Sequence, residues 1–448
     1  MDEQVLIEYV MRQRWYGSKS RNVLHARLLD SVVLRTTEPQ FALALVELSF
    51  ETGAHDTYQL LYALRDGELE LDGLDEPQLA RELVSAIRSG LTLHGAEGIV
   101  EFRPIEGFAA LGRELSEARS IAGEQTNTSI VFDDELILKA FRRLEAGINP
   151  ELEMLRFLTE HGFPNIALLG GWYQYAGGPI STTLGILQQF VRDGRDGWEL
   201  ALEELGNAPE AFLARLRRLG EVTGTMHTTL ACDQTDPAFA PETPSVEALG
   251  LLTATVDEEI ERMFVDLPDD DDRVAPILGR GEEIREQLRL LTHAGSTGKA
   301  IRTHGDYHRG QTLWADSGLE ADWVIIDFEG EPMRSLAERR RKRSPLRDVA
   351  GMLRSFAYAA TVAAIVRDAD VPESWEERAR EQFLGGYYET VDPTLLPAGQ
   401  VACERILAVY ELEKAVYELR YELDNRPAWV GIPVAGIQRL IEQAAAAR

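Results

Sequence analysis

Apolar and polar positions alternate in short runs over the first quarter of the chain. Residues 24–105 contain runs such as FALALVELSF and TYQLLYAL, separated by Gly and Asp, and such runs are typical of strands. The stretch EPQLARELVSAIRSG lies among them, has its apolar residues at helical spacing and ends at Gly90. The pattern therefore predicts a β-rich N-terminal region that contains one helix.

A mixed pattern follows. SIVFDDELILKAF predicts a hairpin of two apolar strands, with Lys139 near the end of the second. NPELEMLRFLTEHG predicts a helix that begins after Asn149-Pro150 and stops at Gly162. Residues 182–191 (TTLGILQQFV) predict another buried strand. This part of the chain is therefore expected to be a small α/β lobe.

From about residue 199 onward the pattern is mostly helical. Segments 209–230, 376–391 and 402–424 have apolar residues at three- and four-residue spacing, whereas the block 301–331 is strand-rich and polar. We therefore expect three parts: a β-rich N-terminal part over residues 1–95, a mixed β/α lobe over 96–198 and a helical lobe over 199–448.

Composition narrows the class of protein. The 448 residues are 44% hydrophobic and 27% charged, as in an ordinary globular protein, and the net charge of −29 argues against a nucleic-acid or anionic-membrane surface. The two cysteines make no disulfide framework. The N-terminus lacks the features of a signal peptide, and no apolar run is long enough to cross a membrane. We expect a cytoplasmic protein.

The block 301–331 contains the candidate chemistry. HGDYHRGQ at 304–311 cannot be a helix interior because two glycines interrupt it, and VIIDFEGEP places Asp327 at the end of an apolar strand. A carboxylate there needs neutralisation, for which Mg²⁺ is suited, and Gln311 offers a second oxygen ligand. Asp306 is then free to accept a proton. The spacing matches the base and metal ligands of kinases, although each acid could instead lie on a solvated turn.

A kinase also requires a phosphate-binding lysine on a strand and a helix glutamate to orient it. Lys139 and Glu153 have these positions, although Lys139 could be an ordinary exposed lysine. The loop GEQTNTS before the hairpin could hold phosphates through backbone N–H groups and small polar side chains. The candidates in this loop are Gln125, Thr126, Thr128 and Ser129.

Several motifs resemble the bacterial maltokinases, relatives of the aminoglycoside phosphotransferases. They occur in family order over nearly the whole chain: RQRWYGSKSR, EQTNTSIVF, GRDGWELA, HGDYHRGQ, IIDFEGEP, SPLRDVAGMLRSF, and YELDNRPAW followed by IPVAGI. The resemblance implies an α+β, eukaryotic protein kinase-like bilobal fold with an N-terminal cap subdomain. It also implies ATP-dependent phosphorylation of maltose at its anomeric C1 hydroxyl, giving maltose 1-phosphate for glycogen and α-glucan synthesis. Association with a trehalose synthase is a possible consequence.

The resemblance assigns roles to individual residues. Asp306 matches the catalytic base, and Gln311 and Asp327 match the Mg²⁺ ligands. Lys139 matches the lysine that contacts the ATP phosphates, with Glu153 as its partner. The family pattern also implies an adenine-binding hinge at Gln189–Val191 and a buried aspartate, Asp348, that steadies the catalytic loop. Glu329 stands where protein kinases have the Gly of DFG, and Tyr16 stands where Phe is more usual.

A sugar acceptor needs polar groups and an aromatic or apolar platform. The C-terminal helix and the segment after it supply Tyr417, Glu418, Tyr421 and Arg426, which the resemblance places beside the active site. Glu329 and Glu331, just beyond Asp327, are second choices. The plain alternative is that the tyrosines are helix core and the glutamates are solvated. The basic run at 339–343 is either a solvated loop or a contact to an anionic substrate or product.

Other functions stay open. An amino-sugar kinase specific for glucosamine would need an extra carboxylate to pair with the ammonium group. A nucleotide-binding module without activity would be expected to lack the lysine, the base or the metal aspartate, and all three are present. An aminoglycoside kinase would not explain the N-terminal cap or the NRPAW segment.

Overall fold

The computed structural model of the chain forms two compact units. It describes residues 3–446 except 20, 67, 72–73, 75, 122–125, 269–270, 292–297, 317–320, 333 and 373. Unit 1 consists of Met1–Glu160 and Ile166–Asp193, and unit 2 consists of His161–Asn165 and Gly194–Arg448.

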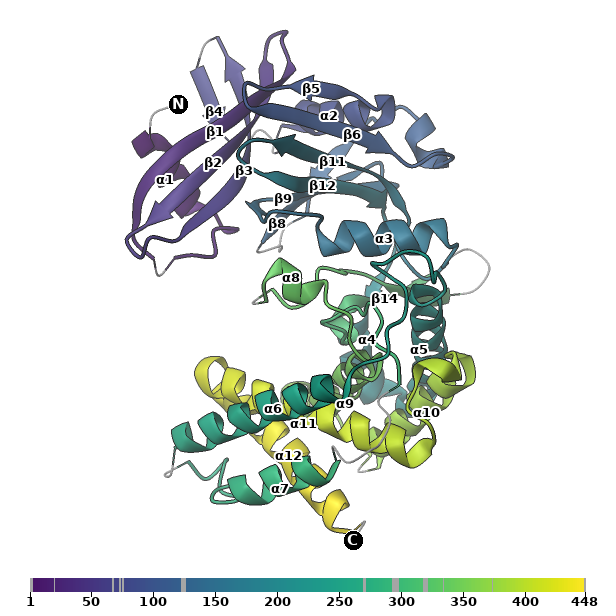
Figure 1. The fold of residues 1–448 in the computed structure, drawn as a ribbon. Helices are drawn as coiled ribbons and strands as arrows, with labels where there is room; N and C mark the ends of the chain where they lie inside the picture. The colour runs from purple at the N-terminus through teal and green to yellow at the C-terminus, as the bar shows by residue number, and fades with distance from the viewer. Residues whose placement is uncertain are drawn as a thin grey trace. The chain divides into compact units, whose positions relative to one another are not determined.

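Unit 1 begins with a helix and an antiparallel sheet (Figure 1). Alternate residues of the second strand, from Ala42 to Phe50, share a hydrophobic core with Leu6 and Val10 of helix α1, so one face of the sheet is covered by this helix. The sheet order is β1-β2-β3-β10, and β4 pairs with β3. The elements are α1 (Glu3–Arg12), β1 (Val23–Arg35), β2 (Gln40–Phe50), β3 (His55–Arg65), β4 (Glu68–Leu71) and β10 (Arg143–Leu144).

The second sheet of unit 1 has the order β5-β6-β11-β12-β9-β8-β7. The expected hairpin is β8 and β9, and the expected helices are α2, which ends at Gly90 in the left-handed conformation (φ 61°), and α3. The elements are α2 (Pro77–Ser89), β5 (Thr92–His94), β6 (Gly98–Pro104), the 3-10 turn η2 (Ala109–Gly112), β7 (Ala118–Ser120), β8 (Asn127–Phe132), β9 (Leu136–Phe141), α3 (Pro150–Glu160), β11 (Leu169–Gly177) and β12 (Ser181–Gln189).

Two buried polar residues join the two sheets of unit 1. Gln59 of β3 donates from Nε2 to the carbonyls of Phe141 and Leu184, both at 2.9 Å. Asp30 of β1 accepts hydrogen bonds from the Tyr175 hydroxyl at 2.7 Å and from three backbone amides at 2.8–3.1 Å. Buried polar groups at these positions fix which strands meet, because an unpaired donor or acceptor there would cost free energy.

Replacing Asp30 with Asn should destabilise unit 1 by about 2 kcal/mol at pH 7, because charge-assisted hydrogen bonds are lost. Burial acts to raise the pKa of Asp30, but the Tyr175 hydroxyl and the backbone amides outweigh it and lower the pKa. The stabilisation is therefore complete above the unfolded carboxyl pKa of about 4 and is lost as the pH falls through the lower folded pKa.

Urea unfolding followed by tryptophan fluorescence checks this prediction. The wild type should lose stability below about pH 4 more steeply than Asp30→Asn, since the variant has no carboxylate to protonate. Tyr175→Phe removes one neutral donor and should cost less. A variant with unchanged stability at pH 7 would contradict the role of Asp30.

Unit 2 is mainly helical and contains a three-stranded sheet of order β13-β14-β15. The expected helices are confirmed as α5, α10 and α11, and the strand-rich block supplies β14 and β15. Helices α5 and α10 approach closely at Gly220 and Gly386, where a Cβ atom would lie 2.0–2.1 Å from a backbone oxygen of the facing helix. A separate core joins α6, α7, α11 and α12.

The elements of unit 2 follow in chain order. They are β13 (Arg195–Asp196), α4 (Gly197–Asn207), α5 (Pro209–Leu230), α6 (Val246–Asp266), α7 (Gly281–Leu291), η3 (Arg309–Gln311), β14 (Thr312–Asp316), β15 (Ala321–Ile325), α8 (Leu336–Arg339), α9 (Leu346–Arg367), α10 (Trp375–Thr390), η4 (Pro393–Leu395), α11 (Gln400–Asn425), η5 (Pro427–Trp429) and α12 (Gly431–Ala446). Among the helices of the described residues, none has the length and apolar character needed to cross a bilayer.

Candidate active site

A buried carboxylate binds the backbone of the loop that contains Asp306. Asp348, in the first turn of α9, accepts hydrogen bonds from the backbone amides of His304 at 2.7 Å and Gly305 at 3.0 Å. His227 of α5 lies 3.3 Å from the same carboxylate through Nε2. Asp348 therefore has the loop-steadying position that the sequence resemblance implied.

Side chains of the loop itself fix its shape. His304 Nε2 donates to the carbonyl of Ile326 at 2.9 Å, and His308 Nδ1 accepts from the Gly310 amide at 3.1 Å. The Tyr307 hydroxyl is 2.9 Å from that of Thr223. The two histidines thus fix the shape of the loop on both sides of Asp306.

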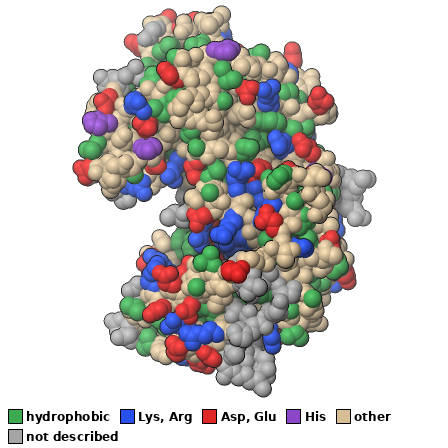
Figure 2. All heavy atoms as spheres, viewed as in Figure 1, with side chains coloured by type: hydrophobic (Ala, Val, Ile, Leu, Met, Phe, Trp, Pro, Cys, Tyr) green, Lys and Arg blue, Asp and Glu red, His purple; other side chains and the backbone are tan. Residues whose placement is uncertain are grey.

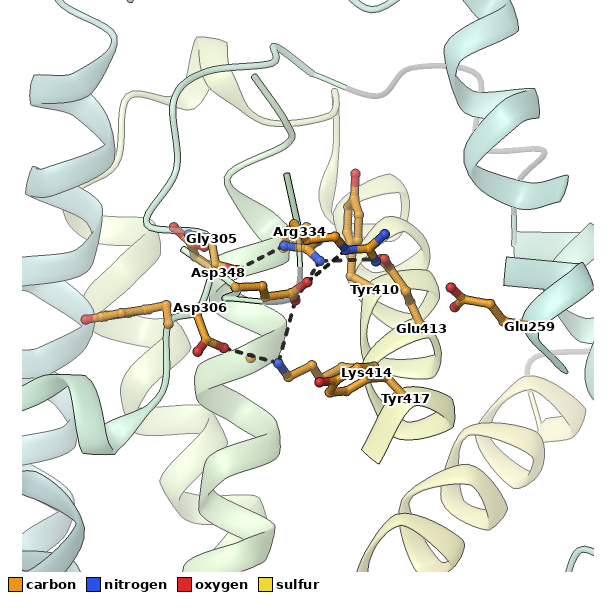
Figure 3. Close-up of a pocket in the computed structure, with 13 residues that line it drawn as sticks. Glu259, Gly305, Asp306, Arg334, Asp348, Tyr410, Glu413, Lys414 and Tyr417 are labelled. Atoms are coloured by element: carbon orange, nitrogen blue, oxygen red, sulfur yellow. Dashed lines mark hydrogen bonds and ion pairs between the residues drawn. The ribbon is translucent and has the colours of Figure 1, made fainter. Parts of the chain in front are cut away.

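Asp306 projects from this loop toward Lys414 of α11 (Figure 3). Lys414 Nζ lies 3.5 Å from Asp306 Oδ1, and His308 Nε2 lies 3.9 Å from Oδ2. Burial acts to raise the pKa of Asp306, but Lys414, His308 and His304 outweigh it and lower the pKa below its ordinary value. The carboxylate is therefore ionised at neutral pH and can accept a proton.

The two predicted metal ligands lie on adjacent segments of unit 2. The amide of Ile326 donates to the Gln311 carbonyl at 3.0 Å, which brings the 3-10 turn η3 beside the residue that precedes Asp327. The strand β15 ends at Ile325, and Asp327 then has φ 62°, a left-handed conformation that turns the chain sharply. A carboxylate and an amide are hard oxygen donors, so this pair fits Mg²⁺.

Lys139 in unit 1 forms a buried ion pair with a glutamate that the sequence did not suggest. Its Nζ lies 2.8 Å from Glu151 Oε2, and the two side chains are only 10% and 2% exposed. Glu151 is in the first turn of α3, where Asn149 Oδ1 accepts from its amide at 2.8 Å. Glu151 is therefore an observed partner of Lys139 that the sequence did not suggest, and Glu153, two residues later on the same helix, stays a predicted partner.

The predicted phosphate-binding loop is partly strand. Gln125 lies outside the described residues, and Thr126 is exposed just before β8. Within β8 the hydroxyl of Thr128 accepts from Arg142 Nε at 2.8 Å, and Ser129 pairs in register with Lys139. Directly paired residues of antiparallel strands share a face, so Ser129 and Lys139 lie side by side. Contacts of these residues to a nucleotide stay a prediction.

The predicted hinge follows β12. The amide of Gln189 donates to the Leu168 carbonyl at 2.9 Å, and the amide of Phe190 donates to Glu135 at 2.8 Å. Val191 is half-buried in the next position. Since these two amides are already used, adenine recognition at 189–191 stays a prediction that depends on the remaining backbone groups.

A pocket in unit 2 opens beside Asp306 (Figure 3). Arg347 of α9 donates to the Gly305 carbonyl at 3.1 Å and to Glu331 Oε1 at 3.0 Å, and it lies 3.7 Å from Glu413. Lys414 lies 3.9 Å from the same Glu331 oxygen. The pocket is lined by Glu259, Gly305, Asp306, Tyr307, Glu331, Arg334, Arg347, Asp348, Gly351, Tyr410, Glu413, Lys414 and Tyr417.

Sequence reasoning had found only part of this pocket. It missed Lys414, Arg347, Glu413 and Glu259 as acceptor-site candidates. Lys414 had a usable signal, because it precedes Tyr417 by three residues on a strongly predicted helix and so lies on the same face. The others come from segments far apart in the sequence.

The predicted acceptor residues divide between two places. Tyr417 and Glu331 line the pocket, and the ring centroid of Tyr417 is 5.4 Å from Lys414 Nζ. Glu329, Glu418, Tyr421 and Arg426 are not among the lining residues. The guanidinium of Arg426 lies over the rings of Tyr421 at 5.6 Å and Trp429 at 4.9 Å, whereas Glu418 accepts from the buried Arg354.

Comparison with known proteins identifies two matching families. The model of the phosphotransferase enzyme family matches residues 117–384, more than half of the chain, and the maltokinase N-terminal cap domain matches residues 9–89. A glucosamine kinase from Streptacidiphilus jiangxiensis is 26% identical over 354 residues, 76% of either chain. A glucosamine kinase from Mycolicibacterium smegmatis is 26% identical over 347 residues, 72% of this chain and 80% of the relative.

Solved structures agree on the fold. A glucosamine kinase in complex with glucosamine, ADP and inorganic phosphate superposes with a TM-score of 0.72 at 21% identity, covering 97% of this chain and 98% of that one. Another crystal form of a glucosamine kinase gives 0.73 at 22% identity, covering 97% and 99%. The expected fold class, an α+β kinase-like fold with an N-terminal cap, is confirmed, as is the expectation of a phosphotransferase. The chain belongs to the phosphotransferase enzyme family.

Proposed function

We propose that this protein is an ATP-dependent sugar kinase whose acceptor is maltose, phosphorylated at the anomeric C1 hydroxyl. The observation that carries the kinase assignment is the ionised Asp306, held by the Asp348-anchored loop at the wall of a polar pocket that Tyr417 flanks. A sugar hydroxyl in this pocket would meet a proton acceptor, and ionised side chains of both signs would bind its other hydroxyls.

The proposed reaction gives a role to each candidate residue. Lys139 of unit 1, oriented by Glu151, would contact the phosphates of ATP. Asp327 and Gln311 of unit 2 would hold Mg²⁺, which when bound neutralises charge on the transferred phosphoryl group. Asp306 would orient the attacking hydroxyl and take its proton. Lys414 and Arg347 would position the base, since they contact Asp306 and the carbonyl of Gly305.

Two features favour maltose as the acceptor. Tyr417 and Tyr421 are 46% and 41% exposed and lie one turn apart on α11, about 6 Å along the helix axis. Such a row of rings can support two linked hexose units. Asp306 and Glu331 are already paired with resident cations, so the surroundings of the base suit a neutral hydroxyl better than an ammonium group.

A second candidate is glucosamine, and one residue favours it. Glu259 lines the pocket, and among the described residues no Lys, Arg or His nitrogen lies within 4.0 Å of its carboxylate. Burial, together with Glu413 and Glu331, raises the pKa of Glu259. An ammonium group would relieve this crowding of negative charge. The names of the relatives agree with this candidate.

The test measures ATP consumption with Mg²⁺ and a panel of maltose, glucosamine, glucose, trehalose and kanamycin. We expect turnover with maltose and a product that no longer reduces copper, because its anomeric carbon is blocked. Glu259→Gln distinguishes the candidates: it should change maltose turnover less than threefold but lower kcat/KM for glucosamine at least tenfold if glucosamine is the acceptor. Turnover with glucosamine and not maltose would contradict maltose as the acceptor and leave the kinase assignment in place.

The ion pair of Lys139 gives a matched test within α3. Glu151→Gln should lower kcat/KM for ATP by at least tenfold, because Lys139 loses its orienting carboxylate, whereas Glu153→Gln should have a smaller effect. Steady-state kinetics at varied ATP, with circular dichroism as a folding control, measures both variants. The reverse order of effects would identify Glu153 as the functional partner.

The wider setting of this proposal rests on the sequence resemblance. A maltose kinase would supply maltose 1-phosphate to α-glucan synthesis in the cytoplasm, with a trehalose synthase as its expected partner.

A further inference from the structure

The basic run that the catalytic site does not use lines a second cavity in unit 2. This basic cavity, about 650 Å³ in volume, lies among the loop 237–245, helices α6 and α11, and the segment 334–344. Figure 2 shows Lys and Arg side chains gathered in the part of unit 2 that α8 occupies in Figure 1. A run that could have been a solvated loop is therefore folded around a space the size of a small-molecule site.

The cavity has more positive than negative side chains. Arg302, Arg334 and the four residues from Arg340 to Arg343 line it, against three carboxylates, Glu242, Glu338 and Glu413. On a chain of net charge −29, such a concentration of cations is a local feature that opposes the overall field.

Two of these cations have no carboxylate of their own. Lys342 Nζ is 2.7 Å from Glu242, and Arg334 is 3.1 Å from Glu331. In contrast, no carboxylate oxygen of the described residues lies within 4.0 Å of the guanidinium of Arg341 or Arg343. Burial and the nearby Arg347 lower the pKa of Arg343 despite Glu413, as expected for a guanidinium with no carboxylate at ion-pair distance.

The other walls indicate what kind of anion would fit. Thr243, Ser245, Thr255 and Ser344 contribute hydroxyls, and α6 and α11 contribute an apolar side of Leu251, Ile406 and Val409. Hydroxyls and carboxylates suit a polyhydroxylated ring, and guanidinium groups suit a phosphate, to which they can donate two hydrogen bonds each. A bare phosphate would leave most of the volume unfilled.

We propose that the basic cavity binds a sugar phosphate, with its phosphate group between Arg341 and Arg343, as a regulatory ligand. Arg334, Tyr410 and Glu413 line both this cavity and the pocket beside Asp306. A ligand in the cavity therefore contacts the wall of the acceptor pocket and raises the KM for the acceptor. This effect on KM rests on the proposed sugar kinase activity, whereas the binding itself does not.

Isothermal titration calorimetry tests the binding with glucose 1-phosphate and glucose 6-phosphate as probes, and with glucose, inorganic phosphate and succinate for comparison. At least one sugar phosphate should bind the wild type at least tenfold more tightly than inorganic phosphate does. The double variant Arg341→Ala/Arg343→Met should weaken this binding at least tenfold, since the methionine keeps the apolar stem and removes the charge. Arg262→Ala, an exposed arginine of α6 outside the cavity, should leave it unchanged.

Four results would overturn the proposal: no binding by either sugar phosphate, binding no tighter than that of inorganic phosphate, binding equalled by succinate, or binding that survives in the double variant. If the double variant does not fold, the single variant Arg341→Ala tests the proposal. The side chain of Arg341 is exposed, so its removal should not prevent folding, and it should weaken sugar phosphate binding about threefold. In steady-state kinetics, the sugar phosphate should raise the acceptor KM of the wild type and not of the arginine variant. If the protein binds sugar phosphate but turns over no sugar, the kinase proposal is refuted and the binding proposal stands.

Discussion

Asp306→Asn is expected to lower kcat by about 10³-fold while changing the Kd for ATP less than about twofold. The substitution keeps the size of the side chain and removes the group that accepts the proton. The loop should keep its shape, because Asp348, His304 and His308 hold it through bonds that do not involve the Asp306 carboxylate. Single-turnover kinetics measures the rate of the chemical step, and equilibrium titration measures the Kd for ATP.

The control for this experiment is Lys414→Met, which leaves the base in place and removes its cation. It should reduce kcat less than Asp306→Asn does, and its pH profile should change. Lys414, with the two histidines, keeps the pKa of Asp306 low, so protonation of this carboxylate should not lower the kcat of the wild type above roughly pH 5. In Lys414→Met the fall of kcat at acid pH should move to higher pH. Near-normal turnover in Asp306→Asn would rule out its role as the base.

Elements with a strong local pattern could be predicted from the sequence. The hairpin β8–β9 and the helices α3, α5 and α11 are long or sharply bounded by Gly, Pro or Asn, so periodicity and end signals agree there. The catalytic loop could be predicted for a different reason: its glycines, acids and glutamine have a spacing that few structures other than a phosphoryl-transfer site require.

Strand β11 shows why other elements could not be predicted. Its sequence LGGWYQYAG contains three glycines, which ordinarily weaken a strand. In the structure the second of them, Gly171, lies where a Cβ atom would be 2.4 Å from the Ile87 side chain and 2.6 Å from the Arg103 carbonyl. The glycine is required by packing between segments distant in sequence, which a local pattern does not reveal.

The pairing of Lys139 with Glu151 was equally beyond the sequence. Glu151 and Glu153 both lie near the start of α3, and successive helix residues are rotated by about 100°, so they point to different sides. Which side faces β9 depends on how the helix packs on the sheet. A spacing argument therefore located the helix that pairs with Lys139 but did not find Glu151, which forms the ion pair.

Glu418→Leu is expected to destabilise unit 2 by about 3–5 kcal/mol, because it leaves a buried arginine without its counter-charge. Arg354 of α9 is 1% exposed, and it donates from Nε at 3.0 Å and Nη2 at 2.8 Å to Glu418 Oε2 on α11. The charge pair thus fixes two helices that carry the acceptor pocket. Urea unfolding monitored by circular dichroism measures the loss.

A double variant separates the charge from the packing. Arg354→Met/Glu418→Leu removes both charges and keeps two apolar side chains of similar length, so it should recover most of the stability that Glu418→Leu loses. If Glu418 acts only through Arg354, the double variant should also keep the acceptor KM within about threefold of the wild type. A large rise in the acceptor KM with recovered stability would instead indicate that Glu418 contacts the sugar. A double variant as unstable as Glu418→Leu would mean that shape, and not charge, determines the contact between α9 and α11.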